Sequence, residues 1–294
     1  MNDTLESLRH KIEGAHKLES VVRTMKALSA ASISQYERAV LALENYHRTV
    51  QLGLLVCFRQ VEQLPLMMKK QATKPESVTA IVFGAGQGLV GPFNDVIVNF
   101  LAAKLRELPG KKAAWAVGES IRTRLEDVGL SPEQLFVIPN SVHTIIPLVG
   151  EVLTHIERTL EARPATVFYL FHNRPVYGSG YQPESRAFIP LDEIWRQELA
   201  GLEWPSKNVP EAMGQVAPTL TALIREYLFS SLFKACAESL ASENASRLAA
   251  MQRAEKNIQE RSNNLSLAFH RLRQEAIDEE LFDLIAGAEA LEGH

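Results

Sequence analysis

Residues 251–272 read MQRAEKNIQERSNNLSLAFHRL, and their apolar side chains recur at a fixed helical interval. Met251, Ile258, Leu265 and Leu272 stand seven residues apart. A strict seven-residue apolar repeat keeps one stripe of a helix against a partner helix and favours a left-handed supercoil. The stretch therefore predicts one helix of a coiled coil, with these four residues in its seam.

Two long arms without proline flank the middle of the chain. All 14 prolines lie between Pro65 and Pro218, and a proline inside a helix removes a backbone hydrogen bond and clashes with the preceding turn. We therefore expect a long helix in each arm; one from 219 to 286 would be roughly 100 Å long. The expected domains are an N-terminal coiled-coil helix over 1–64, an α/β domain over 65–208 and a C-terminal coiled-coil helix over 209–294.

The first arm carries apolar and small residues at alternating spacings of three and four, which also predicts a seam. Ile12 and Val22 are members, and an antiparallel coiled coil within one chain is the simplest pairing of the two arms. An amphipathic helix on a globular core is the alternative. The full series is Leu8, Ile12, Ala15, Leu18, Val22, Met25, Ser29, Ser32, Tyr36, Ala39, Leu43, Tyr46, Val50, Leu54 and Cys57.

The middle of the chain alternates between strand and helix patterns, which predicts a mostly parallel sheet covered on both faces. We expect strands over 78–83, 113–117, 135–138, 166–171 and, at an edge, 186–189, with helices over 92–108, 120–127 and 145–161 and loops over 178–182 and 204–213.

Composition excludes several classes of protein. The net charge of −4 argues against a nucleic-acid binder, and charged residues interrupt every apolar run before it reaches membrane-spanning length. Cys57 and Cys236 are far apart in sequence, which argues against a disulfide framework or a zinc site and fits a reducing cytoplasm. The eight histidines form no pair with metal-ligand spacing. We therefore expect no metal, no cofactor and no catalytic residues.

One motif instead indicates a cofactor-binding domain. Residues 86–91 read GQGLVG, match G-x-G-x-x-G and follow an expected strand, and Glu119 stands where a ribose-binding acid would be. An NAD(P)-binding oxidoreductase domain with helical arms is therefore an alternative function. Against it, Pro92 follows at once and removes a backbone N–H near the place where a pyrophosphate would bind.

The C-terminal arm carries a family resemblance. Residues 238–251 read ESLASENASRLAAM and strongly resemble the signature E-S-x-A-S-E-x-x-x-R-x-x-A-M of the gamma subunit of rotary, F-type ATP synthases. The resemblance extends along the chain in order: LRHKI over 8–12, TMKA over 24–27, GLVGPFN over 88–94, RQEAIDEEL over 273–281 and AGA over 286–288. Residues 84–87, Val90 and Pro92 depart from the family pattern, as expected of a divergent or alternate version.

The resemblance implies an α/β fold, with two long terminal helices in an antiparallel coiled coil around a Rossmann-like domain. It implies a non-catalytic subunit, the central rotary shaft that couples ion flow to ATP synthesis or hydrolysis on alpha and beta subunits. Its implied partners are those alpha and beta subunits, an epsilon subunit and a ring of c subunits, without nucleic acid. The implied location is the cytoplasmic face of the inner membrane, as a peripheral protein. A self-contained coiled-coil adaptor is the other alternative.

The resemblance also implies which residues meet the partners. Basic residues concentrate within 9–26 and 247–273, and acidic ones follow within 275–292, so paired arms would form a basic collar. The residues matched to hexamer contacts are Met25, Arg247, Gln274, Asp278 and Glu280, with Leu281, Leu284 and Ile285 in an apolar sleeve; at Asp278 the family more often has threonine.

Overall fold

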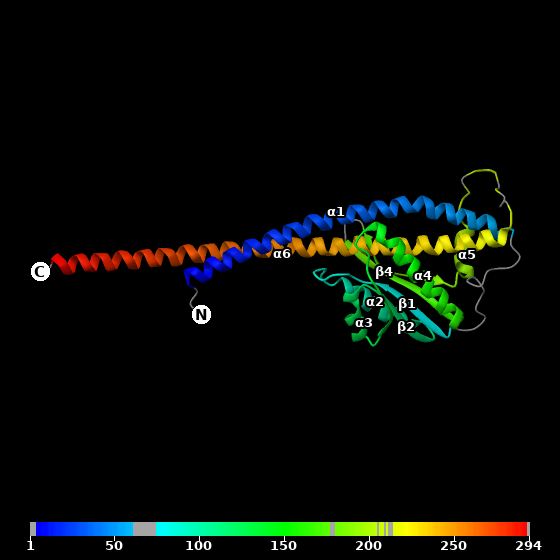
Figure 1. The fold of residues 1–294 in the computed structure, drawn as a ribbon, viewed down its shortest axis with the longest axis horizontal. Helices are drawn as coiled ribbons and strands as arrows, with labels where there is room; N and C mark the ends of the chain where they lie inside the picture. Colours follow the sequence, from blue (N-terminus) through cyan, green and yellow to red (C-terminus); the bar gives the residue numbers. More distant parts are fainter. Residues whose placement is uncertain are drawn as a thin grey trace. The chain divides into compact units, whose positions relative to one another are not determined.

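The computed structural model describes residues 4–60, 75–176, 180–204, 206–208, 210 and 214–292, except the side chains of 193–194, 283 and 286–292 (Figure 1). The chain separates into two compact units, which are described in turn. The helical unit comprises Met1–Ser29 with Leu248–His294, and the sheet unit comprises Ala30–Arg247. The elements are α1 (Leu5–Phe58), β1 (Ser77–Phe83), α2 (Phe93–Glu107), β2 (Lys111–Val117), η2 (Glu119–Ile121), α3 (Arg122–Asp127), β3 (Pro132–Phe136), η3 (Val142–Thr144), α4 (Ile145–Ala162), β4 (Thr166–Val176), β5 (Gly180–Ile189), α5 (Glu193–Ala200) and α6 (Val216–Glu292).

The sheet has the strand order β3-β2-β1-β4-β5, with β1 at its centre. β1 runs parallel to β2 and β4, β2 runs parallel to β3, and β5 is antiparallel to β4 at the edge. The expectation of an α/β fold with a mostly parallel sheet between long terminal helices is therefore confirmed.

Three expectations for the middle of the chain need correction. The strand expected over 135–138 is β3, which begins earlier and spans Pro132–Phe136. The loop expected over 178–182 is wrong for Gly180 and its next two residues, because β5 already pairs with β4 from Gly180 onward; residues 178–179 lie outside the described ranges. The helix α5 was not expected, and Asp192 caps it by accepting a hydrogen bond from the Trp195 N–H at 2.9 Å. The expected boundary at 64/65 and residue 209 also lie outside the described ranges.

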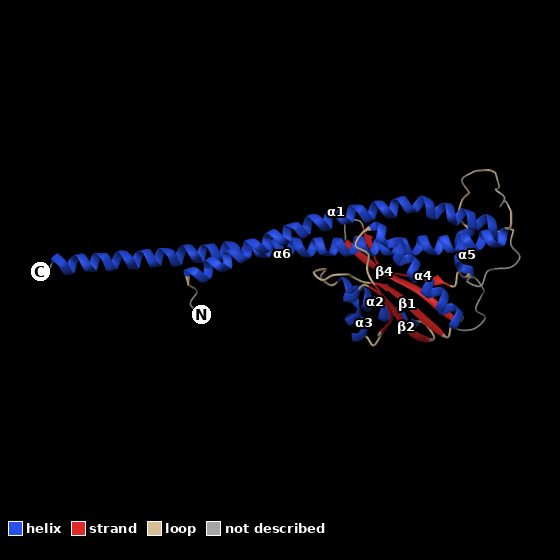
Figure 2. Ribbon diagram, viewed as in Figure 1, coloured by secondary structure: helices blue, strands red, loops and turns tan. Residues whose placement is uncertain are grey.

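Helices cover both faces of the sheet (Figure 2). On one face α2 and α3 bury a smaller core that includes Ile97, Leu101 and Leu125. On the other, α4 and parts of α1, α5 and α6 close a larger core around Trp115, of which only 1% is exposed. Both long helices thus contribute to the main hydrophobic core, so α1 and α6 are structural parts of the sheet unit as well as of the helical unit.

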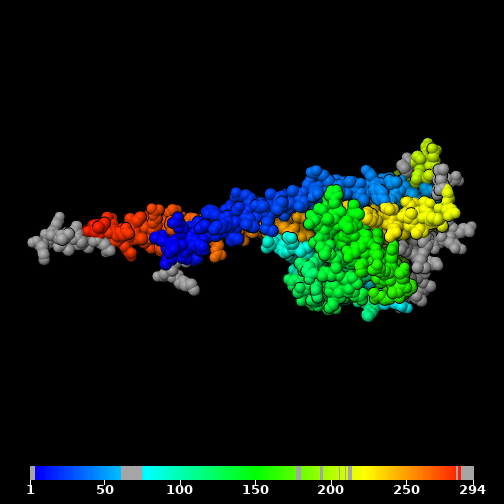
Figure 3. All heavy atoms as spheres, in the orientation of Figure 1, coloured from blue at the N-terminus to red at the C-terminus, as the bar shows by residue number. Residues whose placement is uncertain are grey.

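Within the helical unit, the starts of α1 and the end part of α6 run antiparallel. Lys26 pairs with Glu255, the Gln259 amide donates to Glu19 at 3.3 Å, and Leu5 lies opposite Phe269. Since Leu5 is the first residue of α1, residues 274–292 of α6 continue past the described start of that helix (Figure 1). The atoms drawn in red in Figure 3 belong to this end of α6.

The seam of α1 differs from the expected series at two positions. Leu18 is 59% exposed and Tyr46 is 44% exposed, so neither residue lies in a seam. Glu19 and His47, the next residue in each case, are the partly buried ones. Because both are polar, a search for apolar residues selects their exposed neighbours instead.

His47 provides a pH-dependent contribution to stability. Its Nδ1 lies 2.7 Å from the Ser230 hydroxyl, which donates to the Tyr227 carbonyl at 3.0 Å; Nδ1–H is therefore the donor. Burial, with Arg186 and Lys234 nearby, lowers the pKa of His47 from 6.5 to about 4.

Replacement of His47 should flatten the acid side of the stability profile. Below pH 6.5 the unfolded chain binds a proton that the folded chain does not, so stability falls as the pH decreases towards 4. A fully buried ring would lose about 3 kcal/mol and this part-exposed ring about 1–2 kcal/mol. Urea unfolding of His47→Gln between these pH values should show a smaller loss than the parent. His16→Gln, at an exposed site, should lose as much stability as the parent over the same pH range. Equal losses in the two variants would contradict the assignment.

Candidate functional site

The glycine-rich loop over residues 84–91 lies at the carboxyl end of β1, where the strand order reverses between β1 and β4. Open α/β sheets bind ligands in the crevice at such a switch point. Here α6 is bound to this loop. The Glu243 carboxylate accepts from the Gly86 N–H at 3.4 Å and from the Gln87 N–H, and the Ser246 hydroxyl donates to the Val90 carbonyl.

The same face of α6 also binds β4, just past the last residue of that strand that pairs with β1. The Ser242 hydroxyl donates to the Asn173 carbonyl at 2.9 Å, and the Asn173 amide donates to the Phe93 carbonyl at 3.1 Å. Glu238 lies 2.8 Å from the His172 Nε2. We call Glu238, Ser242, Glu243 and Ser246 the α6 anchor, because together they fix one helix to the carboxyl ends of two central strands.

Glu243 and Arg247 form an almost fully buried ion pair. Their side chains are 6% and 12% exposed, and the guanidinium donates to the carboxylate at 2.5 Å. Burial raises the pKa of Glu243, against the lowering effects of Arg247 and of the Gly86 and Gln87 N–H groups. Arg247 also donates to Asn244 at 3.3 Å. Its charge is therefore held inside the sheet unit and paired there.

This arrangement does not support the oxidoreductase alternative. A carboxylate from α6 takes the loop N–H groups that a pyrophosphate would use. Pro92 is the N-cap of α2 and has no N–H to offer. Glu119, the candidate ribose ligand, is 68% exposed and lies 3.8 Å from Arg122.

The loop glycines should separate a packing role from a phosphate-binding role. A Cβ at Gly84 would overlap Ile121 and one at Gly86 would overlap Ile138, whereas a Cβ at Gly88 would meet no atom within 4 Å. We expect Gly84→Ala and Gly86→Ala to lower the unfolding free energy by about 1–3 kcal/mol through overpacking. Gly88→Ala should stay within about 0.5 kcal/mol. Urea unfolding of the three variants tests this.

Calorimetry with NAD is the complementary measurement. The parent chain should show no saturable heat, because Glu243 already occupies the loop. Saturable binding that Gly88→Ala abolishes would revive the dinucleotide site.

The expected subunit-interaction residues in the helical unit are mostly exposed. Gln274, Asp278 and Glu280 lie on exposed positions of α6, and Met25 is partly buried on α1. The apolar residues Leu281, Leu284 and Ile285 are 53%, 72% and 46% exposed, and Phe282 beside them is 69% exposed. Several large apolar side chains thus face solvent at the end of α6, which is typical of an interaction surface.

The expected seam residues vary in burial. Met251 is 3% exposed and Val22 is 9% exposed, whereas Ile12, Ile258, Leu265 and Leu272 are partly buried.

Leu265 offers a matched test of the seam. It is partly buried, while Leu267, two residues further on the same helix, is 70% exposed. Burial of most of a leucine side chain is worth about 1–2 kcal/mol. Leu265→Ala should therefore lower the unfolding free energy by about that amount, and Leu267→Ala by less than about 0.5 kcal/mol. Equal unfolding midpoints for the two variants would remove Leu265 from the seam.

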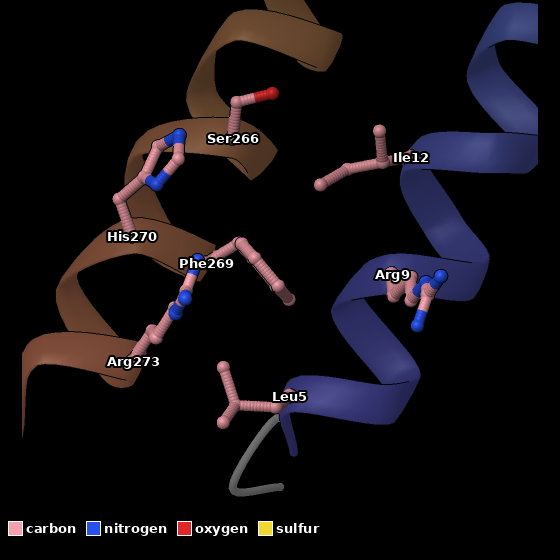
Figure 4. Close-up of a pocket in the computed structure, with 7 residues that line it drawn as sticks. All are labelled: Leu5, Arg9, Ile12, Ser266, Phe269, His270 and Arg273. Carbon is pink, nitrogen blue, oxygen red and sulfur yellow. The ribbon is translucent and has the colours of Figure 1, made fainter. Parts of the chain in front are cut away.

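A basic groove of about 620 Å³ lies between the start of α1 and α6 in the helical unit (Figure 4). Leu5, Ile12 and Phe269 supply its apolar wall, and Arg9 and Arg273 its charge. Neither arginine lies within 4 Å of a carboxylate of the described residues, although Arg9 helps to lower the pKa of Glu13. Other members of the expected basic collar are paired within the unit: Lys26 and Arg23 with Glu255, Lys17 with Glu13 and Lys256 with Glu260.

Sequence reasoning missed the α6 anchor, although its residues lie in the quoted signature. Glu238, Ser242 and Ser246 are four residues apart, which places three polar side chains on one face of a helix. Small polar residues on a face that is otherwise apolar were the available signal.

Within the described ranges, no helix combines the length and apolar character needed to cross a bilayer. Nor do three or more His, Cys, Asp or Glu side chains gather into a metal site in the part of the chain that the structure describes.

Comparison with known proteins shows the family of the chain. The family model described as ATP synthase matches residues 4–291. The gamma chain of Pelotomaculum thermopropionicum is 26% identical over 293 residues, covering 98% of this chain and 99% of that one. The gamma chain of Desulforudis audaxviator is 28% identical over 306 residues, with coverage of 98% and 99%. A chain in the mitochondrial ATP synthase of Euglena gracilis shares the fold, with a TM-score of 0.63 at 17% identity over 98% of this chain and 94% of that one. The chain therefore belongs to the ATP synthase family, and the relatives that it resembles over nearly its whole length are gamma chains.

Proposed function

We propose that this chain is the central rotary shaft of an F-type ATP synthase. It couples ion flow through the membrane sector to ATP synthesis or hydrolysis on alpha and beta subunits. The observation that carries the proposal is the end of α6, where Leu281, Phe282 and Leu284 are exposed on a helix that continues past the described start of α1. Such apolar side chains need a protein sleeve, and the family supplies one in its hexamer of alternating alpha and beta subunits.

The α6 anchor supports a mechanical role. A shaft transmits torque only if its helix does not slip against the domain through which it is turned. Polar contacts from Glu238 to Ser246 fix α6 to the sheet in both position and rotation, and the shared hydrophobic core adds to them. In this proposal the sheet unit is held by the epsilon subunit and the ring of c subunits, and the helical unit turns inside the hexamer.

The residues of the helical unit take the following roles in the proposal. Gln274, Asp278 and Glu280 make exposed, exchangeable polar contacts, each worth only about 0–1 kcal/mol, which suits a part that must slide past its partners. Met25 packs near the part of the alpha–beta hexamer that surrounds the helical unit. Arg247 acts through Glu243, as a positioning residue for the anchor. The chain itself performs no chemistry in this proposal, and it resides at the cytoplasmic face of the inner membrane through its complex.

Affinity purification of the tagged full chain tests the proposal. Alpha, beta and epsilon subunits should co-purify with it, in the proportions of one hexamer around one copy. ATPase activity should appear only in the assembled complex. A chain that is recovered alone, stable and without these subunits would instead be a self-contained adaptor.

A further inference from the structure

A second polar cavity lies in the sheet unit, between the β4–β5 hairpin and α6. Its volume is about 70 Å³, several times the roughly 10–15 Å³ that one water molecule needs. His172 from β4, Arg186 from β5 and Ser231, Lys234 and Glu238 from α6 line it. We propose that this cavity binds a small oxyanion of the hydrogen phosphate class, independently of the shaft function.

Two buried polar atoms lack partners in the wall of this cavity. His172 is 4% exposed and Ser231 is 6% exposed, yet the His172 Nδ1 and the Ser231 Oγ have no hydrogen-bond partner. Buried polar atoms are nearly always satisfied, and an unsatisfied one calls for an unseen partner. Both residues line the same cavity, and we assign their missing partner to one occupant of it.

The charge of the lining favours an anion. Glu184 pairs with Arg174 at 3.3 Å, and Glu238 lies 3.9 Å from Lys234 and 2.8 Å from His172. Arg186 has no carboxylate partner among the described residues; it donates to the Tyr227 hydroxyl at 2.7 Å. Three permanent cations therefore face two carboxylates, which leaves an excess of positive charge around the cavity.

The hydrogen-bonding pattern selects an oxyanion that also carries a proton. Ser231 and the cationic Arg186 and Lys234 donate to acceptor oxygens. The Glu238 carboxylate can only accept, so the His172 Nε2 donates to it. In the neutral ring Nδ1 is then an acceptor and needs a donor from the occupant. Hydrogen phosphate has acceptor oxygens and an O–H donor, whereas sulfate and chloride have no donor at neutral pH. The outer residues Arg174 and Lys234 are 47% and 38% exposed, which leaves a route from solvent.

Calorimetric titration of the full chain with inorganic phosphate tests the site. The parent should bind one phosphate more tightly than sulfate. Ser231→Ala and Arg186→Gln should each weaken phosphate binding at least about tenfold, as expected for the loss of a charge-assisted or buried hydrogen bond. Ser231→Ala leaves the fold intact because it removes only an unpaired hydroxyl.

Arg48→Gln is the control, because Arg48 is exposed on α1 and does not line the cavity. Its phosphate affinity should equal that of the parent. The ring-nitrogen NMR signal of His172 should also shift with phosphate in the parent and not in Ser231→Ala. Equal affinities for phosphate and sulfate, or equal losses in Arg48→Gln and Arg186→Gln, would overturn the proposal and leave water as the occupant.

Discussion

Glu243→Ala is expected to lower the free energy of unfolding by about 3–5 kcal/mol, because it leaves the Arg247 guanidinium buried and unpaired. The substitution also removes the acceptor of the Gly86 and Gln87 N–H groups. Urea unfolding of the full chain measures the change. A double-mutant cycle with Arg247→Ala should show that the two losses do not add, since both variants break the same pair.

Glu275→Ala is the matched control for this variant. Glu275 pairs with Arg271 at 3.1 Å over the same i,i+4 spacing on the same helix, but the side chains of the pair are 57% and 83% exposed. Such surface pairs contribute about 0–1 kcal/mol. A loss for Glu243→Ala no larger than that for Glu275→Ala would mean that the anchor does not hold α6 to the sheet.

Replacement of Leu281, Leu284 and Ile285 by serine is expected to weaken binding to the alpha–beta hexamer at least about tenfold. Burial of three apolar side chains in a sleeve supplies well over the free energy of a tenfold change. The isolated chain should unfold as before, because all three residues are exposed in it. Binding of the purified chain to reconstituted hexamer, and its urea midpoint, provide the two measurements.

A second triple variant tests whether the effect is specific. Leu135, Val137 and Ile146 are also large, apolar and exposed, at 41%, 86% and 53%, but they lie in the sheet unit. Their replacement by serine should leave hexamer affinity unchanged. Similar losses of hexamer affinity for both triple variants would show nonspecific hydrophobic binding rather than a sleeve around the end of α6.

The long helices were predictable because periodicity over many turns outweighs single exceptions. Where the prediction of the seam failed, a polar residue held the inward position. Glu19 accepts from Gln259 across the helical unit and His47 contacts Ser230 in the sheet unit. Apolar periodicity does not register such residues, so it selected the exposed Leu18 and Tyr46 instead.

The central strands of the sheet were predictable, but of the edge strand β5 only residues 186–189 were expected. The strand β1 is buried throughout and mostly apolar, whereas β5 carries Glu184 and Arg186 and is buried only at its last two residues. The glycine motif was ambiguous for a related reason. A loop that binds a phosphate and a loop that binds Glu243 both need close approach at exposed N–H groups. Only the placement of α6 against the loop distinguishes the two, and that contact joins residues more than 150 positions apart.

Direct observation of rotation is the measurement that tests the central claim. Cys57 and Cys236 are buried, so a cysteine introduced at the 86% exposed Val137 would carry a probe specifically. With the hexamer fixed to a surface and ATP supplied, the shaft proposal predicts that the probe rotates repeatedly in one direction. It should pause while each catalytic site in turn hydrolyses ATP. ATP hydrolysis at an undiminished rate with the probe stationary would contradict it.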